Sequence, residues 1–292
     1  MSELKLRPPE GTVCDSHSSP RRGLLKYSRT RKGRPLLRIR PVVLSLCIAL
    51  GIIGCSKKDS DESVEPPAPT AVVDPATAGS ISGTVKLEGA PPSFKPIDMS
   101  AEATCVQANP SAVIPPIVVT GSHSALANVV VYVKSGLGSY RFDIPATPAV
   151  LDQKGCMYEP RILAVMARQP FEVHNEDQTI HNVHAMPREN RAWNKSEPVG
   201  DPPIEANFTK PELAIPIACN IHPWMRAYMF VFAHPYFAIT PKTGDFELKG
   251  LPPGTYVIEA WQERFGTRDQ TITLGPKETK SISFTFVSAQ FK

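Results

Sequence analysis

From Ser80 onward, short apolar stretches alternate with segments rich in Gly, Pro and polar residues. Many stretches are β-branched or aromatic, such as residues 129–133, and no window of helical length carries a sustained 3.6-residue apolar repeat. Short strands joined by Gly- and Pro-rich connections are typical of sandwiches and barrels, so we predict an all-β fold. The predicted strands cover residues 81–85, 129–133, 161–166, 171–174, 213–219, 229–233, 246–248, 256–260, 271–274 and 281–286.

Two of these strands, 161–166 and 171–174, flank the short segment 167–170. This spacing predicts that they form a hairpin. The roughly 210 residues after Gly79 are enough for two small β domains. The sequence contains no tandem repeat.

The first 54 residues have a different composition. They carry 11 Lys and Arg against 3 Asp and Glu, and the apolar run 42–53 follows the last basic residue. That run is too short for a helix that crosses the roughly 30 Å hydrocarbon core, and the arrangement predicts an export signal. An ordinary cleaved signal or a short membrane anchor would be the alternatives.

The end of this segment, Ile52-Ile53-Gly54-Cys55, resembles the lipobox of bacterial lipoproteins. The resemblance implies that residues 1–54 are removed and that Cys55 carries lipid. Because Ser56 and not Asp follows, it implies the outer membrane, facing the periplasm. Residues 55–79 are rich in Pro and charge, which predicts a disordered tether.

Removal of the basic signal also changes the net charge. The whole chain has a net charge of +4, and the first 54 residues contribute +8, so the remainder is −4. The exported part therefore has no basic footprint for nucleic acid.

Six cysteines occur in the chain, and three remain in the exported part if Cys55 is lipidated and Cys14 and Cys47 leave with the signal. Export favours disulfides, but three thiols cannot all pair within one chain. Cys219 alone has soft and imidazole neighbours close by in the sequence. We therefore expect Cys105 to pair with Cys156 and Cys219 to be protected in another way, such as by a metal.

The stretch Gly244 to Trp261, GDFELKGLPPGTYVIEAW, contains two strands joined by a Leu-Pro-Pro-Gly turn in which Gly254 can adopt a positive φ. It resembles the carboxypeptidase regulatory-like (transthyretin-like) β-sandwich family, as do the strands near residues 81–85 and 127–133. The resemblance implies one sandwich made of residues 80–149 and 236–292, with a second domain, 150–235, inserted or placed next to it.

The inserted part contains a set of soft and borderline metal donors. A thiol, two imidazoles and a thioether occur in two stretches, EVHNEDQTIHNVHAM and CNIHPWMRAYMFVF. Such donors suit copper and disfavour Mg²⁺ and Ca²⁺. Taken singly, each residue is more typical of a disulfide, a core position or ordinary packing.

Together the two stretches resemble the cupredoxins, whose copper loop has the form Cys-x-x-His-Pro-aromatic-Met-Arg. The resemblance implies a Greek-key copper sandwich with His181, Cys219 and His222 as strong ligands and Met225 as a weak axial ligand. It implies that Asn182 braces the site by hydrogen bonds. It also implies that His222 lies near the surface as the electron port, within an apolar docking patch made by Pro223 and Trp224.

The remaining histidines have no expected role in the metal site. His184 lies three residues from His181, so in an extended strand it points to the opposite face and is expected to be structural. His174 ends a predicted strand and is expected to face solvent or to be hydrogen-bonded. His123 and His234 have no partner that the sequence identifies.

These features predict a lipid-anchored electron-transfer protein of the cell envelope with one type 1 copper, and not an enzyme. Its partner would be a periplasmic redox protein or enzyme. The alternative is an envelope binding or structural lipoprotein whose copper domain stores copper or is degenerate. The sequence has neither Met- and His-rich tracts typical of storage nor the His-x-His pairs of multicopper oxidases.

Overall fold

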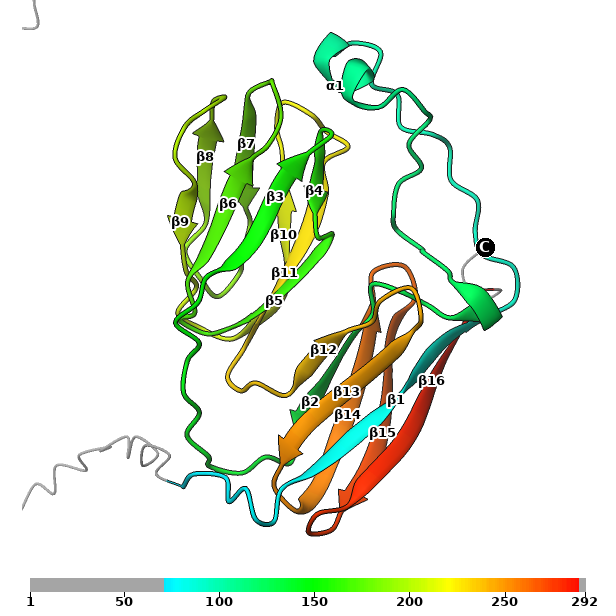
Figure 1. The fold of residues 1–292 in the computed structure, drawn as a ribbon, viewed down its shortest axis with the longest axis vertical. Helices are drawn as coiled ribbons and strands as arrows, with labels where there is room; N and C mark the ends of the chain where they lie inside the picture. The colour runs from blue at the N-terminus through cyan, green and yellow to red at the C-terminus, as the bar shows by residue number, and fades with distance from the viewer. Residues whose placement is uncertain (1–70, 289–292) are drawn as a thin grey trace, which may run out of the picture. The chain divides into compact units, whose positions relative to one another are not determined.

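A computed structural model describes residues 71–288 of the chain (Figure 1). The predicted signal, Cys55 and the first part of the predicted tether lie outside these residues. Sixteen strands, one short α-helix and one 3₁₀ turn make up the described part, so the prediction of an all-β fold is confirmed. None of the described helices has the length and apolar composition needed to cross a membrane.

The outer sandwich, as we name it, consists of β1, β2 and β12 to β16. One sheet has the order β13-β1-β16 and the other the order β12-β2-β14-β15. The strands are β1 (Gly79–Glu88), β2 (Val130–Ser135), β12 (Phe237–Ile239), β13 (Asp245–Leu251), β14 (Gly254–Gln262), β15 (Gly266–Leu274) and β16 (Thr279–Val287). Their inward side chains form one buried core that includes Ile81, Val131, Ile258 and Phe284.

The Leu-Pro-Pro-Gly turn carries the chain from β13 in one sheet to β14 in the other. The positive φ expected at Gly254 occurs instead at Gly250, which has a φ of 73°. At Gly254 the absent side chain matters for space, because a Cβ there would lie 3.2 Å from the Tyr256 hydroxyl. That hydroxyl donates a hydrogen bond to the carbonyl of Pro252 across the turn.

The inserted sandwich consists of β3 to β11. Its sheets have the orders β5-β11-β10-β7-β8 and β4-β3-β6-β9. The strands are β3 (Ala149–Lys154), β4 (Met157–Glu159), β5 (Ile162–Met166), β6 (Phe171–Asn175), β7 (His181–Ala185), β8 (Trp193–Glu197), β9 (Ile204–Ala206), β10 (Glu212–Ala218) and β11 (Arg226–Phe232). Val165, Phe171, Ile217 and Met229 are among the residues of its core.

The hairpin predicted for residues 161–174 is wrong. β5 pairs with β11 in one sheet, and β6 pairs with β3 and β9 in the other. Arg168 adopts a left-handed φ of 71° in the connection, and the chain crosses there between the two sheets. Each strand thereby gains long-range partners that the local sequence does not indicate.

The long connection between β1 and β2 departs from the predicted boundary at residue 149. It contains α1 (Ala103–Ala108) and the 3₁₀ turn η1 (Ser122–Ser124). Met99 and Cys105 of this connection are buried in the core of the inserted sandwich. Part of the connection between β1 and β2 therefore packs in the inserted sandwich and not in the outer one.

Residues 71–79, assigned to the tether from sequence, also make contacts. Ala71 forms an isolated bridge with Tyr140, and the Thr77 carbonyl accepts a hydrogen bond from the Lys277 amide at 2.9 Å. β1 begins directly afterwards, at Gly79.

A third apolar cluster joins the two sandwiches. Val130 and Tyr132 of β2 meet Ile162, Phe230 and Phe232 of β5 and β11, all buried. A buried ion pair also joins the two sandwiches. Arg161, before β5, binds Glu263, after β14, through Nε at 2.5 Å and through Nη2 at 2.7 Å.

Candidate metal centre

The loop between β10 and β11 brings together the thiol and one imidazole. Cys219 follows β10 directly, and Arg226 begins β11, so the loop is closed by the pairing of these two strands. The Met225 carbonyl accepts a hydrogen bond from the Cys219 amide at 3.2 Å, and the Met225 amide donates to the His222 carbonyl at 2.9 Å. The His222 amide in turn lies 3.4 Å from the Cys219 Sγ. Met225 itself is fully buried in the core.

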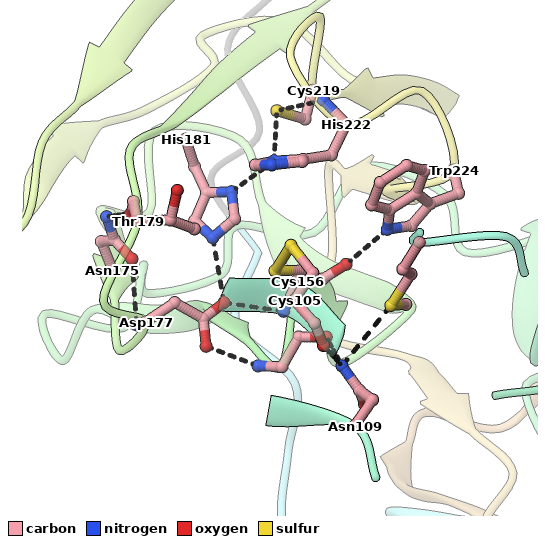
Figure 2. Close-up of a disulfide and its surroundings, with 12 residues drawn as sticks. Cys105, Asn109, Cys156, Asn175, Asp177, Thr179, His181, Cys219, His222 and Trp224 are labelled. Carbon is pink, nitrogen blue, oxygen red and sulfur yellow. Dashed lines mark hydrogen bonds and ion pairs between the residues drawn. A yellow bond between two sulfur atoms is a disulfide. The ribbon is translucent and has the colours of Figure 1, made fainter. Parts of the chain in front are cut away.

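The second imidazole comes from β7. His181 opens this strand, which pairs with β10 through Ile217 and Ala218 next to Cys219. Its Nδ1 lies 2.9 Å from the Nδ1 of His222, which is 3.7 Å from the Cys219 Sγ (Figure 2). One donor atom from each of these three residues lies within 4.8 Å of the other two, and all three side chains are buried.

Asn182 holds the thiol side of this group. Its Oδ1 accepts from the Asn220 amide at 2.7 Å and lies 3.4 Å from the Cys219 Sγ. Its Nδ2 donates to Asn194 on the next strand at 2.6 Å. The side chain thus connects the loop after β10 to β7 and β8.

Asp177 is a site residue that the sequence analysis missed. Its Oδ2 lies 2.9 Å from the Nε2 of His181 and also accepts from the Cys156 amide at 2.7 Å. Its Oδ1 accepts from the Gly155 amide at 2.7 Å. A histidine ligand whose other nitrogen donates to a carboxylate is fixed in one orientation. The position of Asp177 in the loop before His181 was the available signal.

The charges of the site favour metal ligation. Burial alone would raise the pKa of Cys219, but the His181 imidazole and neighbouring backbone amides outweigh it and lower that pKa. Burial also lowers the pKa of His222, and the nearby charge of His181 lowers it further. A thiolate and a neutral imidazole are the forms in which these side chains bind metals.

Asp177 and His181 each stabilise the charged form of the other. Burial tends to lower the pKa of His181, but hydrogen bonds and charge from Asp177 and Cys219 outweigh it and raise that pKa. Burial would raise the pKa of Asp177, whereas His181 and the two turn amides lower it. Asp177 therefore remains a carboxylate that accepts a hydrogen bond from the Nε2–H of His181. The Nδ1 of His181 then faces the other donors.

Cys105 and Cys156, the pair expected from sequence, form a disulfide with an S–S distance of 2.02 Å, and Cys219 is free. The bond joins α1 to the turn between β3 and β4. A ring nitrogen of His222 lies within 4.8 Å of both sulfurs. Figure 2 shows the disulfide beside the two imidazoles.

His222, expected near the surface as the electron port, is covered, because its side chain has 0% exposure. The disulfide lies against it on one side, and the Trp224 ring lies 5.3 Å from its ring on another. Trp224 is itself only partly exposed, and its indole N–H donates to the Cys156 carbonyl at 3.0 Å. Of the predicted docking patch, only Pro223 is exposed.

The other histidines among residues 71–288 lie outside the group of three donors. The Nδ1 of His184 is 3.3 Å from Asn220 Oδ1, and His174 lies between Glu172 and Asp152 at 2.9 and 3.7 Å. His234 has partners that the sequence did not indicate, because its Nε2 donates to the Val133 carbonyl and its Nδ1 accepts from the Tyr236 amide. His123 lies in η1 with a φ of 54°.

These donors fit a copper ion. Two imidazole Nδ1 atoms and one thiol sulfur face one another in a buried position, with a buried thioether in the same loop. Soft sulfur combined with imidazole suits copper, whereas carboxylates, which hard ions prefer, are absent from the inner group.

Comparisons with known proteins give only partial structural likenesses. No family model and no curated protein matches the chain. A copper-containing nitrite reductase from Thermus scotoductus aligns over 34% of this chain and 24% of its own, with 21% identity and a TM-score of 0.28. This chain thus spans about a quarter of that reductase.

Two smaller proteins align over most of their own length. A purple cupredoxin from Nitrosopumilus maritimus aligns over 28% of this chain and 98% of its own, with 19% identity and a TM-score of 0.25. A Cu(I) form of an amicyanin variant aligns over 30% of this chain and 86% of its own, with 22% identity and a TM-score of 0.26. These structural neighbours are cupredoxins, but with such TM-scores the assignment of the site rests on its own geometry.

Proposed function

We propose that this protein is an electron-transfer protein with a single copper ion held by His181, Cys219 and His222. Met225, from the same loop, is the weak fourth ligand of a type 1 site. The observation that carries the proposal is the convergence of two imidazole Nδ1 atoms and one free thiol in a buried position. Bound copper supplies a centre that gains and loses one electron between Cu(I) and Cu(II).

The chain's own residues keep the donors in place. Asp177 fixes the ring of His181 through Nε2, and Asn182 holds the Cys219 side of the loop. Strand pairing of β7, β10 and β11 sets the spacing between the two stretches. A site whose ligands are fixed in this way changes little between oxidation states, which favours rapid electron transfer.

Loading the purified protein with Cu(II) tests the proposal. We expect one copper per chain and an intense thiolate-to-copper absorption in the visible. Cys219→Ser should abolish that band, because an alcohol cannot replace the thiolate, and His181→Ala should open or lose the site. Met225→Leu should keep the copper and the colour while raising the reduction potential, because loss of the weak thioether disfavours Cu(II).

His184→Ala is the matched control, since it removes an imidazole of the same strand outside the donor group. Its spectrum should match that of the parent protein. If His184 proves essential for the band and His181 dispensable, the ligand set is wrong. If a folded protein binds no copper, the domain is degenerate and a binding or structural role replaces electron transfer.

The burial of His222 favours a second candidate, in which the domain retains copper without exchanging electrons rapidly. Stopped-flow reduction of the Cu(II) form by a small inorganic reductant distinguishes the two. Electron transfer requires the blue colour to be lost rapidly on mixing with the reductant. Copper retention is supported if the copper stays bound and the blue colour persists in the presence of the reductant.

The proposal also includes lipid on Cys55 and a location at the outer membrane, facing the periplasm. The partner in this proposal is a periplasmic redox protein or enzyme. These parts of the proposal rest on the lipobox-like end of the first 55 residues and on the export signal. In this proposal the protein carries electrons between partners and is not itself an enzyme.

A further inference from the structure

The disulfide joins two parts of the chain that both lie beside the histidines of the metal centre. Cys105 comes from α1 in the connection between β1 and β2, and Cys156 comes from the turn between β3 and β4. Both cysteines have 0% exposure. A bond so close to the donor atoms, yet outside the ligand set, calls for a role of its own.

On the α1 side, the disulfide holds a cover over His222. Cys105 is the one buried residue of this six-residue helix, which has no side-chain cap at its N-terminus. Asn109, directly after α1, adds a hydrogen bond to the turn, because its Nδ2 donates to the Gly155 carbonyl at 2.8 Å as well as to the Cys105 carbonyl at 2.9 Å. So short a helix is marginal by itself, and the covalent bond keeps it against the site.

On the turn side, the disulfide holds the partner of His181. Gly155 and Cys156 adopt left-handed φ values of 60° and 55°. In this conformation both of their amides point at the Asp177 carboxylate, at 2.7 Å each. Successive amides arranged in this way form an anion-binding concavity. The carboxylate held there is the one that accepts from His181 Nε2.

We propose that the Cys105–Cys156 disulfide is a positioning element of the metal centre. Through its turn it holds Asp177 against His181, and through α1 it keeps His222 out of contact with solvent. The inference rests on the proposed function only in taking these two histidines as ligands. It assigns the disulfide a structural role at the site, in keeping with the burial of both sulfurs.

Two measurements on the metal-free protein test the two arms separately. The first is the Nε2–H proton of His181 in ¹H–¹⁵N NMR, which should be a downfield, slowly exchanging resonance while Asp177 accepts it. The second is carbethoxylation of His222 by diethyl pyrocarbonate, mapped by mass spectrometry, with the partly exposed His184 as internal reference. His222 should be protected in the parent protein.

The double variant Cys105→Ser/Cys156→Ser should lose both the His181 resonance and the protection of His222. Asp177→Asn should lose the resonance and keep the protection, because it cuts only the turn arm. Tyr132→Phe, which removes a buried hydrogen bond to Glu259 in the outer sandwich, controls for general loosening and should change neither readout. Loss of both signals in that control would show that general loosening of the fold explains them, and it would overturn the positioning role of the disulfide.

A folded double variant that keeps the resonance and the protection would also overturn the proposal. If that variant does not fold, Asn109→Ala decides, since it keeps the covalent bond and removes the hydrogen bond from the Asn109 side chain to the turn. It should raise the rate at which His222 is modified relative to His184, and an unchanged rate would contradict the cover. Neither readout requires copper, so both remain decisive if the copper proposal fails.

Discussion

Removing one partner of the ion pair between Arg161 and Glu263 should weaken the contact between the two sandwiches. The side chains are only 9% and 6% exposed, and two hydrogen bonds of 2.5 and 2.7 Å join them. Glu263→Gln keeps the shape of the side chain but leaves the guanidinium buried without its counter-charge. Breaking a buried pair in this way costs about 3–5 kcal/mol, and we expect about 3 kcal/mol because Arg161 also donates to the Arg226 carbonyl at 3.2 Å.

Urea unfolding followed by tryptophan fluorescence measures this loss. Trp193 and Trp224 report on the inserted sandwich and Trp261 on the outer one. With a slope of about 3 kcal/mol per M, the midpoint should fall by about 1 M. Glu247→Gln is the control, because its pair with Lys249 is exposed at 46% and 75%. That change should cost less than about 1 kcal/mol.

The double variant Arg161→Met/Glu263→Leu completes the test. Replacing a buried ion pair with apolar residues of similar volume is often neutral, so most of the stability lost in Glu263→Gln should return. The reasoning is refuted if Glu263→Gln costs no more than Glu247→Gln, or if the double variant is as unstable as the single one.

Three further predictions follow from other parts of the molecule. Burial would raise the pKa of Glu212, but hydrogen bonds from the Arg188, Glu189 and Asn190 amides and from the Asn190 side chain outweigh it and lower that pKa. The ionised Glu212 therefore stabilises the fold at neutral pH, and this stabilisation is lost as the pH falls below about 4.3. The difference in urea midpoint between the parent and Glu212→Gln should therefore shrink from pH 7 to pH 4, and a constant difference would contradict the assignment. Gly83→Ala should cost about 1–3 kcal/mol in thermal or urea unfolding, because its Cβ would lie 1.8 Å from the Ile282 carbonyl oxygen, whereas Ser82→Ala should be nearly neutral. Cys55→Ser should release the protein from the membrane fraction and prevent labelling with radioactive fatty acid; a parent protein that takes up no label would disprove the lipid anchor.

The sequence predicted the strands that are rich in β-branched and aromatic residues, and it missed strands such as β7 that have few of them. β2, β14 and β16 are rich in β-branched and aromatic residues, and they lie close to their predicted positions. β7 begins with His181-Asn182 and is short of apolar residues, so its strand character comes from pairing with β8 and β10. The predicted hairpin at 161–174 does not form, because β5 pairs in parallel with β11 and β6 pairs in parallel with β3.

The grouping of the candidate metal donors was predictable because their types and order are informative, whereas their surroundings were not. Cys219 and His222 lie in one loop, and the position of His181 followed from a resemblance. The burial of His222 depends on Cys105, which precedes it by more than a hundred residues and reaches the site through a connection with no predicted structure. No local pattern encodes that contact.

The pairing of β1 with β16 sets an order for folding of the chain. Ser80 lies opposite Thr279, 199 residues later, and β1 forms the centre of its sheet between β13 and β16. Every strand of the inserted sandwich leaves the ribosome before either partner of β1 does. Because chains are made from the N-terminus and distant contacts close slowly, the inserted sandwich can form first, while β1 waits with both edges open. The early half of the outer sandwich is therefore the part of this protein most in need of a chaperone during synthesis.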